Sequence, residues 1–279
     1  MKKFLTLLLV IFSICSFFTR PVEADVGPKP SVKINVVNAP ESSYYLVLLS
    51  DKDSYGPWAK IEDVNDNISD ENEKEAYAFF VSYKDSDGFN FIGNMSNDLK
   101  GIDEYSWNYY PPETFKVAIY VPEDGSFYLS SEVTREAFYS YYTVDCSKVS
   151  LDIKEDVRVA DVLLNLLFRI VLTILCEVLI ALLFGYRNKK ELTLIIIVNI
   201  ITQIVLNVIM SFFDYYGGMM LWLILLPVGE LIVIIIEEIV YLIGLKSHSK
   251  WRAFFYCLLA NLLSCSLTFA GLFVGAAVH

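Results

Sequence analysis

The sequence predicts a membrane protein of two parts, an extracellular all-β, sandwich-like domain followed by a bundle of four transmembrane helices. Three observations predict this fold class. Hydrophobic residues make up 55% of the 279-residue chain, above the share of an ordinary soluble domain. Residues 25–160 contain most of the acidic groups and several short apolar segments separated by polar turns. Residues 161–279 are dominated by Leu, Ile and Val in four long runs.

The beginning of the chain, residues 1–24, is typical of a secretory signal peptide. Two lysines precede an apolar run over residues 4–18, and a small-residue cleavage site ends at Ala24. We therefore expect the mature chain to begin at Asp25. A lipid anchor at Cys15 and an uncleaved anchor are the alternatives, and the bulky residue before Cys15 disfavours the first.

The exported domain is expected to cover residues 25–156 and to contain several short strands. Alternating or short apolar segments predict strands over residues 31–37, 44–49, 76–83, 115–121, 125–129, 138–143 and 149–153. Residues 122–125, Pro-Glu-Asp-Gly, form a turn signature between two of them. Residues 131–137 fit a helical turn or a loop. Several short strands with polar turns predict a β-sandwich, and a single cysteine, Cys146, excludes a disulfide framework.

An aromatic segment of this domain is a candidate ligand-binding site. Trp107, Tyr109 and Tyr110 precede two prolines and lie outside a clean strand pattern. Exposed aromatic rings in a loop are suited to stacking on a sugar or holding a peptide. The alternative is that these rings cap one end of the sandwich.

Two acidic segments, residues 62–71 and 85–88, supply hard oxygen ligands at short spacing, as a calcium site does. Neither has the twelve-residue spacing and closing Glu of the common calcium loop. The sequence therefore favours solvated loops, and we assign no metal and no cofactor to the chain.

The four apolar runs predict transmembrane spans at about 162–184, 192–213, 219–243 and 253–276, within a membrane domain over residues 157–279. Basic residues occupy the first and third connecting loops, whereas the second loop, residues 214–218, has none. The positive-inside rule then places the first and third loops in the cytoplasm. The N-terminal domain and the C-terminus are expected outside the cell.

Polar residues within the spans predict a layer at matched depth. Counted from the cytoplasmic ends, Glu177, Asn199, Glu237 and Asn261 lie at a similar depth, one in each span. Ionisable residues inside a span usually face a bundle interior or a watery cavity. A more central level contains Gln203 and Glu230, and a third, nearer the outer surface, contains Arg169.

Two interpretations of these polar residues remain open at the level of sequence. In the first, they are joined by interhelical hydrogen bonds that only stabilise the bundle. In the second, Glu177 and Glu237 form a carboxylate pair that shares a proton or binds a cation, with Asn199 and Asn261 as neutral ligands. Arg169 is a candidate ion-pair partner for Glu230 or Glu177, which would favour the structural interpretation.

The order of these features resembles that of envelope proteins of Gram-positive bacteria. The shared features are an export signal, a β-rich domain and four spans, with Asn199, Gln203 and Asn207 on the second span and Glu230 and Glu237 on the third. The resemblance covers the whole chain and implies a location in the cell envelope, without implying an activity.

The sequence therefore predicts a non-enzymatic sensor or accessory protein, whose exported domain binds a ligand or partner. The expected partners are the lipid bilayer and another membrane or cell-wall component. Nucleic acid is excluded because the net charge is −11 and no basic stripe exists. The alternative function is proton- or cation-coupled transport through the bundle. An intramembrane hydrolase is the third function considered. The pair Glu237 and Glu238 resembles the paired glutamates of the CAAX-type proteases. The arginine four residues after the pair and the intramembrane histidines of those enzymes are missing here.

Overall fold

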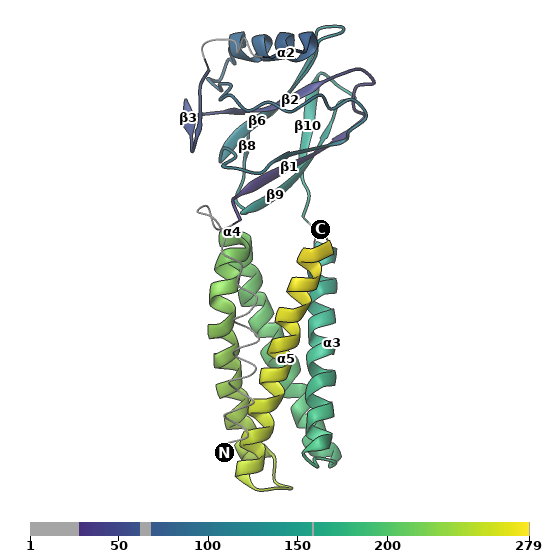
Figure 1. Cartoon of the computed structure of the whole chain (residues 1–279), viewed down its shortest axis with the longest axis vertical. Coiled ribbons are helices and arrows are strands. Elements are labelled where there is room, and N and C mark those ends of the chain that lie inside the picture. The colour runs from purple at the N-terminus through teal and green to yellow at the C-terminus, as the bar shows by residue number, and fades with distance from the viewer. Residues whose placement is uncertain (1–27, 62–67, 158, 279) are drawn as a thin grey trace.

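The computed structural model describes residues 28–61, 68–157 and 159–278, with side chains described up to Ser266 and not at residue 161. The predicted signal peptide and part of the acidic segment 62–71 lie outside the described residues. Figure 1 shows a β-rich part at one end and long apolar helices that extend away from it.

The β-rich part is built on one eight-stranded sheet that is nearly closed. The strand order is β2-β6-β7-β10-β9-β1-β5, and β8 pairs with β6. The sheet changes direction at β10, whose first residues pair with β7 and whose later residues pair with β9. The strands are β1 Ser31–Val37, β2 Tyr45–Ser50, β5 Glu104–Trp107, β6 Thr114–Val121, β7 Ser126–Ser130, β8 Val133–Thr134, β9 Tyr139–Asp145 and β10 Ser150–Glu155, and a small hairpin is formed by β3 Ser54–Tyr55 and β4 Trp58–Ala59.

The main core lies between the two halves of this sheet. In β1, Val32, Ile34 and Val36 alternate with more exposed residues and are almost fully buried, as period-two alternation predicts. They pack with inward-facing residues of β2, β6 and β9. The strands β2 and β6 are buried on both faces, because a second apolar cluster covers their other side.

A helix contributes to the second apolar cluster, and the sequence prediction for this segment was wrong. Residues 76–83, predicted as a strand, belong to the helix α2, Glu71–Ser82. The carboxylate of Asp70 accepts a hydrogen bond from the backbone N of Glu73 at 2.9 Å and caps the helix. Ala76 and Phe80 are four residues apart and therefore share the buried face. The N-terminal part is β-rich rather than all-β.

The remaining strand predictions are confirmed with shifts of one or two residues at their ends. Residues 122–125 form the expected turn, in which the backbone N of Gly125 donates to the carbonyl of Val121. The undecided segment 131–137 contains the short strand β8. The segment at Trp107 was expected outside a strand but belongs to β5, where Trp107 lies opposite Val32 of β1.

Three helices form the second part: α3 Val159–Leu183, α4 Lys189–Gly244 and α5 Lys250–Val278. Two of them, α3 from Val162 and α4, are long and apolar enough to cross a membrane. Each of the three contacts the other two. Figure 1 shows α5 returning toward the β-rich part.

The helix α4 is broken near its middle at Gly218, where the backbone has a non-helical φ of 67° and ψ of −175°. Side chains show that its halves lie against each other. Leu206 approaches Gly229 and Leu194 approaches Gly244, so the second half runs back along the first. The sequence predicted two separate spans over residues 192–213 and 219–243. The structure places the reversal at a glycine because few other residues adopt a positive φ at low cost.

Candidate functional site

Two buried glutamates lie among the helices, and each accepts hydrogen bonds from polar side chains of neighbouring helices. The side-chain amide of Asn199 donates to Oε2 of Glu177 at 2.5 Å, and the hydroxyl of Tyr256 donates to the same oxygen at 3.4 Å. The Asn199 amide also lies 3.0 Å from the hydroxyl of Tyr241. All four side chains are fully buried. This group joins α3, both halves of α4 and α5.

The second glutamate has both carboxyl oxygens occupied. The hydroxyl of Thr202 donates to Oε1 of Glu237 at 2.6 Å, and the amide of Asn261 donates to Oε2 at 2.8 Å. Asn261 also donates to the carbonyl of Cys257 at 3.1 Å, one turn earlier in α5. These side chains are at least nine-tenths buried. Two groups of hydrogen bonds therefore surround two carboxyls.

Helical spacing joins the two groups into one network. Asn199 and Thr202 are three residues apart on the first half of α4, and Glu237 and Tyr241 are four apart on the second half, so each pair shares a face. The reversal at Gly218 brings these faces together. We call the complete set the carboxylate network: Glu177, Asn199, Thr202, Glu237, Tyr241, Tyr256 and Asn261.

The network leaves several buried acceptors without a partner. Oε1 of Glu177, Oδ1 of Asn199 and Oδ1 of Asn261 receive no hydrogen bond among the described residues. The ion pairs found in the described part of the chain include neither Glu177 nor Glu237. Two carboxyls thus lie in an apolar interior with neutral donors as their partners. Such a site can share a proton or bind a cation.

Four of the sequence-predicted site residues meet in this network, namely Glu177, Asn199, Glu237 and Asn261. Glu230 is buried on the same face of α4 as Glu237 but makes none of the network's hydrogen bonds. Gln203 instead accepts from the amide of Asn207, at 2.8 Å to its backbone carbonyl and 3.4 Å to its side chain. Sequence reasoning missed Thr202, Tyr241 and Tyr256 as members of the network.

Arg169 is not in an ion pair with either glutamate, contrary to the expectation from sequence. Its guanidinium donates to Oδ1 of Asn207 at 3.2 Å and lies 5.3 Å from the centre of the Trp222 ring. Arg169 is eight residues before Glu177, which is about 12 Å along a helix and explains the separation. Arg169, Trp222 and Asp214 line a cavity of about 370 Å³ that also touches Tyr139 of β9.

The aromatic candidates of the β-rich part divide between core and surface. Trp107 is 1% exposed, and its indole N–H donates to the carbonyl of Tyr109 at 2.8 Å. Tyr109 is 39% exposed and packs edge-to-face on Tyr110. The ammonium of Lys29 lies within 6 Å of both tyrosine rings, at 5.9 and 5.7 Å. Trp107 therefore supports this surface from within, while Tyr109 and Tyr110 form it.

The acidic segment at residues 85–88 holds an ammonium group of the protein itself. Lys116 of β6 donates to Asp85 at 2.9 Å and to Asp87 at 2.5 Å. Burial raises the pKa of Asp85, but hydrogen bonds from Lys116 and from backbone N–H groups outweigh it and the net pKa lies below its usual value. Burial likewise lowers the pKa of Lys116, and the two carboxylates more than reverse the effect. The Lys116 ammonium group thus lies where the sequence offered calcium binding only as the less favoured alternative to a solvated loop.

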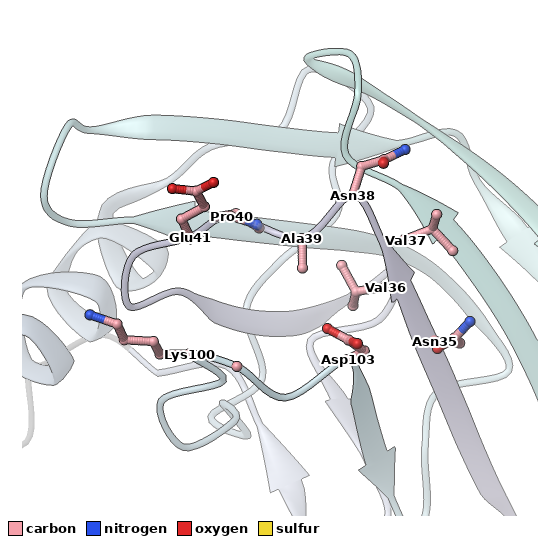
Figure 2. Close-up of a pocket in the computed structure, with 10 residues that line it drawn as sticks. Asn35, Val36, Val37, Asn38, Ala39, Pro40, Glu41, Lys100 and Asp103 are labelled. Carbon is pink, nitrogen blue, oxygen red and sulfur yellow. The ribbon is translucent and has the colours of Figure 1, made fainter.

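A hollow on the β-rich part lies at the end of β1 (Figure 2). Its volume is about 670 Å³, and Asn38, Glu41, Lys100 and Asp103 supply its polar groups. Asn38 has a positive φ of 53° and donates to Asp145 at 2.8 Å, which fixes the turn after β1. The other end of β1, at Ser31, lies next to Phe138 and the helices. The hollow is therefore at the far side of the domain from the helices.

Comparisons of the chain with protein-family models, with characterised proteins and with solved structures find no match.

Proposed function

We propose that this chain is a non-enzymatic protein of the bacterial cell envelope, with a sensor or accessory role. Its exported β-rich domain binds a cell-wall component or an envelope partner, and its helices form a four-helix membrane bundle that receives the resulting change. The main observation that supports this proposal is the contact between the β-rich domain and the reversal of α4.

That contact joins the start of β9 to the middle of α4. The backbone N of Phe138 donates to the carbonyl of Tyr215 at 2.7 Å. The Phe138 ring packs directly on Gly218, where a β-carbon would lie 2.4 Å from a ring atom. Phe138 also directly precedes β9, which pairs with β1, and its carbonyl accepts from the backbone N of Ser31 at 3.1 Å. A displacement of β1 and β9 would therefore move the α4 reversal.

The same reversal lies between the two halves of α4 that supply most of the carboxylate network. Asn199 and Thr202 come from the half before Gly218, and Glu237 and Tyr241 from the half after it. A shift of one half against the other changes the hydrogen bonds between Thr202 and Glu237. The arrangement supports transfer of a binding event from the exported domain to the bundle.

The membrane location is supported by the outward faces of the helices. Large apolar side chains cover these faces and are more than half exposed, which in water would expose an unusually large apolar surface. Examples are Leu164, Phe168, Leu179, Ile201, Phe212, Ile224 and Ile243. A bilayer would cover them and would place the β-rich part and the end of α5 on the same side.

The test of the proposed function is binding by the exported domain followed by a response in the helices. Cell-wall fragments and envelope extracts are offered to the purified segment 25–156 in pull-down and calorimetry. A bound species is then added to the full chain, and the distance between labels on Tyr215 and on β9 is measured. Phe138→Ala should abolish the helix response and keep binding, whereas Phe127→Ala, on the opposite side of the domain, should keep both. A segment that binds none of these species would remove the main support.

A second candidate function is proton- or cation-coupled transport, favoured by one observation. Glu177 and Glu237 lie in one buried network that joins three helices and contains no basic side chain. Flux of protons and cations into liposomes would be compared for the wild type and Glu237→Gln. Equal flux in both, or none in either, would eliminate transport.

A further inference from the structure

The carboxylate network has more acceptors than its own donors satisfy. The amides of Asn199 and Asn261 and the hydroxyls of Thr202 and Tyr256 all donate to the two glutamates. Their donation leaves both amide oxygens and Oε1 of Glu177 without a partner. The parent side chains are at most 1% exposed, so bulk water does not reach them. Each unsatisfied buried acceptor costs free energy.

The charge of the network also indicates that a binding partner is missing. Glu177 and Glu237 are both ionisable, and no Lys, Arg or His of the described residues pairs with them. Arg169, the nearest candidate from sequence, is engaged by Asn207 and Trp222. Two uncompensated carboxylates in an apolar interior would be strongly destabilising. The network therefore needs positive charge from outside the chain.

We propose that the carboxylate network binds one small monovalent cation of the Na⁺ class, with Glu177, Asn199 and Asn261 as its oxygen ligands. The cation is attracted by the charges of both glutamates, so the loss of either carboxylate weakens its binding. Carboxylate and amide oxygens are hard ligands suited to such an ion. No group of three or more His, Cys, Asp or Glu side chains in the described part of the chain could hold a metal, which disfavours a transition metal.

The three ligands come from three different elements, α3, the first half of α4 and α5. Hydrogen bonds already hold each ligand in place: Asn199 also donates to the carbonyl of Ile195 at 3.1 Å, and Asn261 to that of Cys257 at 3.1 Å. The ion would therefore link helices whose ligands are positioned before it binds. This inference deepens the second candidate function but requires binding only, so retained sodium binding without flux would count against transport alone.

The experiment is a sodium titration of the full chain in detergent, followed by thermal unfolding. Choline chloride keeps the ionic strength constant, and potassium chloride is a parallel arm. A ligand that binds only the folded state raises its stability with the logarithm of concentration. We expect Tm to rise with sodium and not with choline. The rise should disappear in Glu177→Gln and in Glu237→Gln.

Glu230→Gln is the matched control, because Glu230 is a buried carboxyl on the same face of α4 outside the network. It should keep the full sodium response. If Glu177→Gln does not fold, retention of radioactive sodium by the wild type and Glu237→Gln gives the same comparison. Equal Tm in sodium and choline, or a response that persists in both network variants, would overturn the proposal. A Tm that depends on pH alone would overturn it too and assign the network to protons and bound water.

Discussion

Replacement of Lys116 by methionine tests the buried ion pair that anchors β6 to the 85–88 segment. Lys116→Met keeps most of the length of the side chain and removes the ammonium group with its charge. The Asp85 side chain is only 2% exposed and would remain as a buried carboxylate without its main partner. Removing one partner of a buried pair costs about 3 to 5 kcal/mol of unfolding free energy.

The expected loss lies at the lower end of that range. Asp87 is 64% exposed, so its share of the interaction is screened and contributes under about 1 kcal/mol. Asp85 would also keep hydrogen bonds from the backbone N of Asp87 at 3.1 Å and the hydroxyl of Tyr83 at 3.3 Å. We therefore expect a loss of about 3 kcal/mol at neutral pH, as a buried unpaired charge remains.

The pH dependence of this loss has a definite sign. The pKa of Asp85 is below its usual 3.8 in the folded state, so its contribution to stability is present above pH 3.8 and is lost as the pH falls through the folded pKa. The pKa of Lys116 is above 10.5, so its contribution is present below pH 10.5 and is lost at higher pH. The wild type should exceed Lys116→Met in stability throughout this window, and the difference should shrink at the acid end.

Urea unfolding of the segment 25–156, followed by tryptophan fluorescence, measures the difference. The main hydrophobic core lies inside this segment, so the measurement does not need the helices. Combining Lys116→Met with Asp85→Asn removes both charges and should recover much of the loss. Equal stability of wild type and Lys116→Met at neutral pH, or a difference unchanged in acid, would refute the reasoning.

Three further changes have expected outcomes. Gly218→Ala forces a positive φ of 67° on alanine and directs a β-carbon at the Phe138 ring, so thermal unfolding in detergent should show a loss of about 2 kcal/mol or more; an unchanged Tm would contradict the close contact. Phe80→Ala empties the space between α2 and the sheet and should cost about 3 to 5 kcal/mol in urea unfolding, with the sheet signal in circular dichroism retained. Glu177→Leu removes the carboxylate acceptor of the Asn199 amide, which keeps only the Ile195 carbonyl and the Tyr241 hydroxyl, and should cost about 1 to 3 kcal/mol, while Glu177→Gln, which keeps an acceptor oxygen, should cost less than half of that.

The sequence predicted strands well where one face of the strand is buried. Val32, Ile34 and Val36 alternate with polar residues and define β1 unambiguously. Residues 76–83 were mistaken for a strand because their apolar residues do not alternate and a short apolar run fits either structure. The decisive signal lay just before them: Asp70 followed by Glu73 is a helix start, and Ala76 and Phe80 have helical spacing.

The sequence predicted part of the site, from the depth of the polar residues within the predicted spans. Counting residues from the helix ends predicted to be cytoplasmic grouped Glu177, Asn199, Glu237 and Asn261, which the structure joins by hydrogen bonds, because equal counts along neighbouring helices give similar depths. The method treated tyrosine and threonine as apolar, and so it missed the hydroxyls that complete the network. Depth counting did place Arg169 at a separate level, but it could not show which side chains Arg169 contacts, since rotation about the helix axis and the partners on other helices depend on packing.

At the helix ends opposite the β-rich part, one carboxylate connects the start of α4 to the loop after α4. Glu191 accepts hydrogen bonds from the backbone N of Lys246 at 2.7 Å, the backbone N of Ser247 at 2.8 Å and the Ser247 hydroxyl at 2.6 Å. His248 of the same loop contacts the carbonyl of Gly185 at 3.1 Å. These hydrogen bonds connect the loops after α3 and after α4.

Because these helix ends are held together, we expect the helices to tilt about a common pivot near Glu191. A helix of the length of α3, 25 residues, is about 38 Å long. A tilt of about 5° around the pivot moves its far end by about 3 Å, roughly the length of a hydrogen bond. Small rotations at Glu191 therefore open or close contacts mainly beneath the β-rich part, at Phe138. The carboxylate network lies nearer the pivot, since Glu177 is six residues from the end of α3, and it moves by only a fraction of that distance.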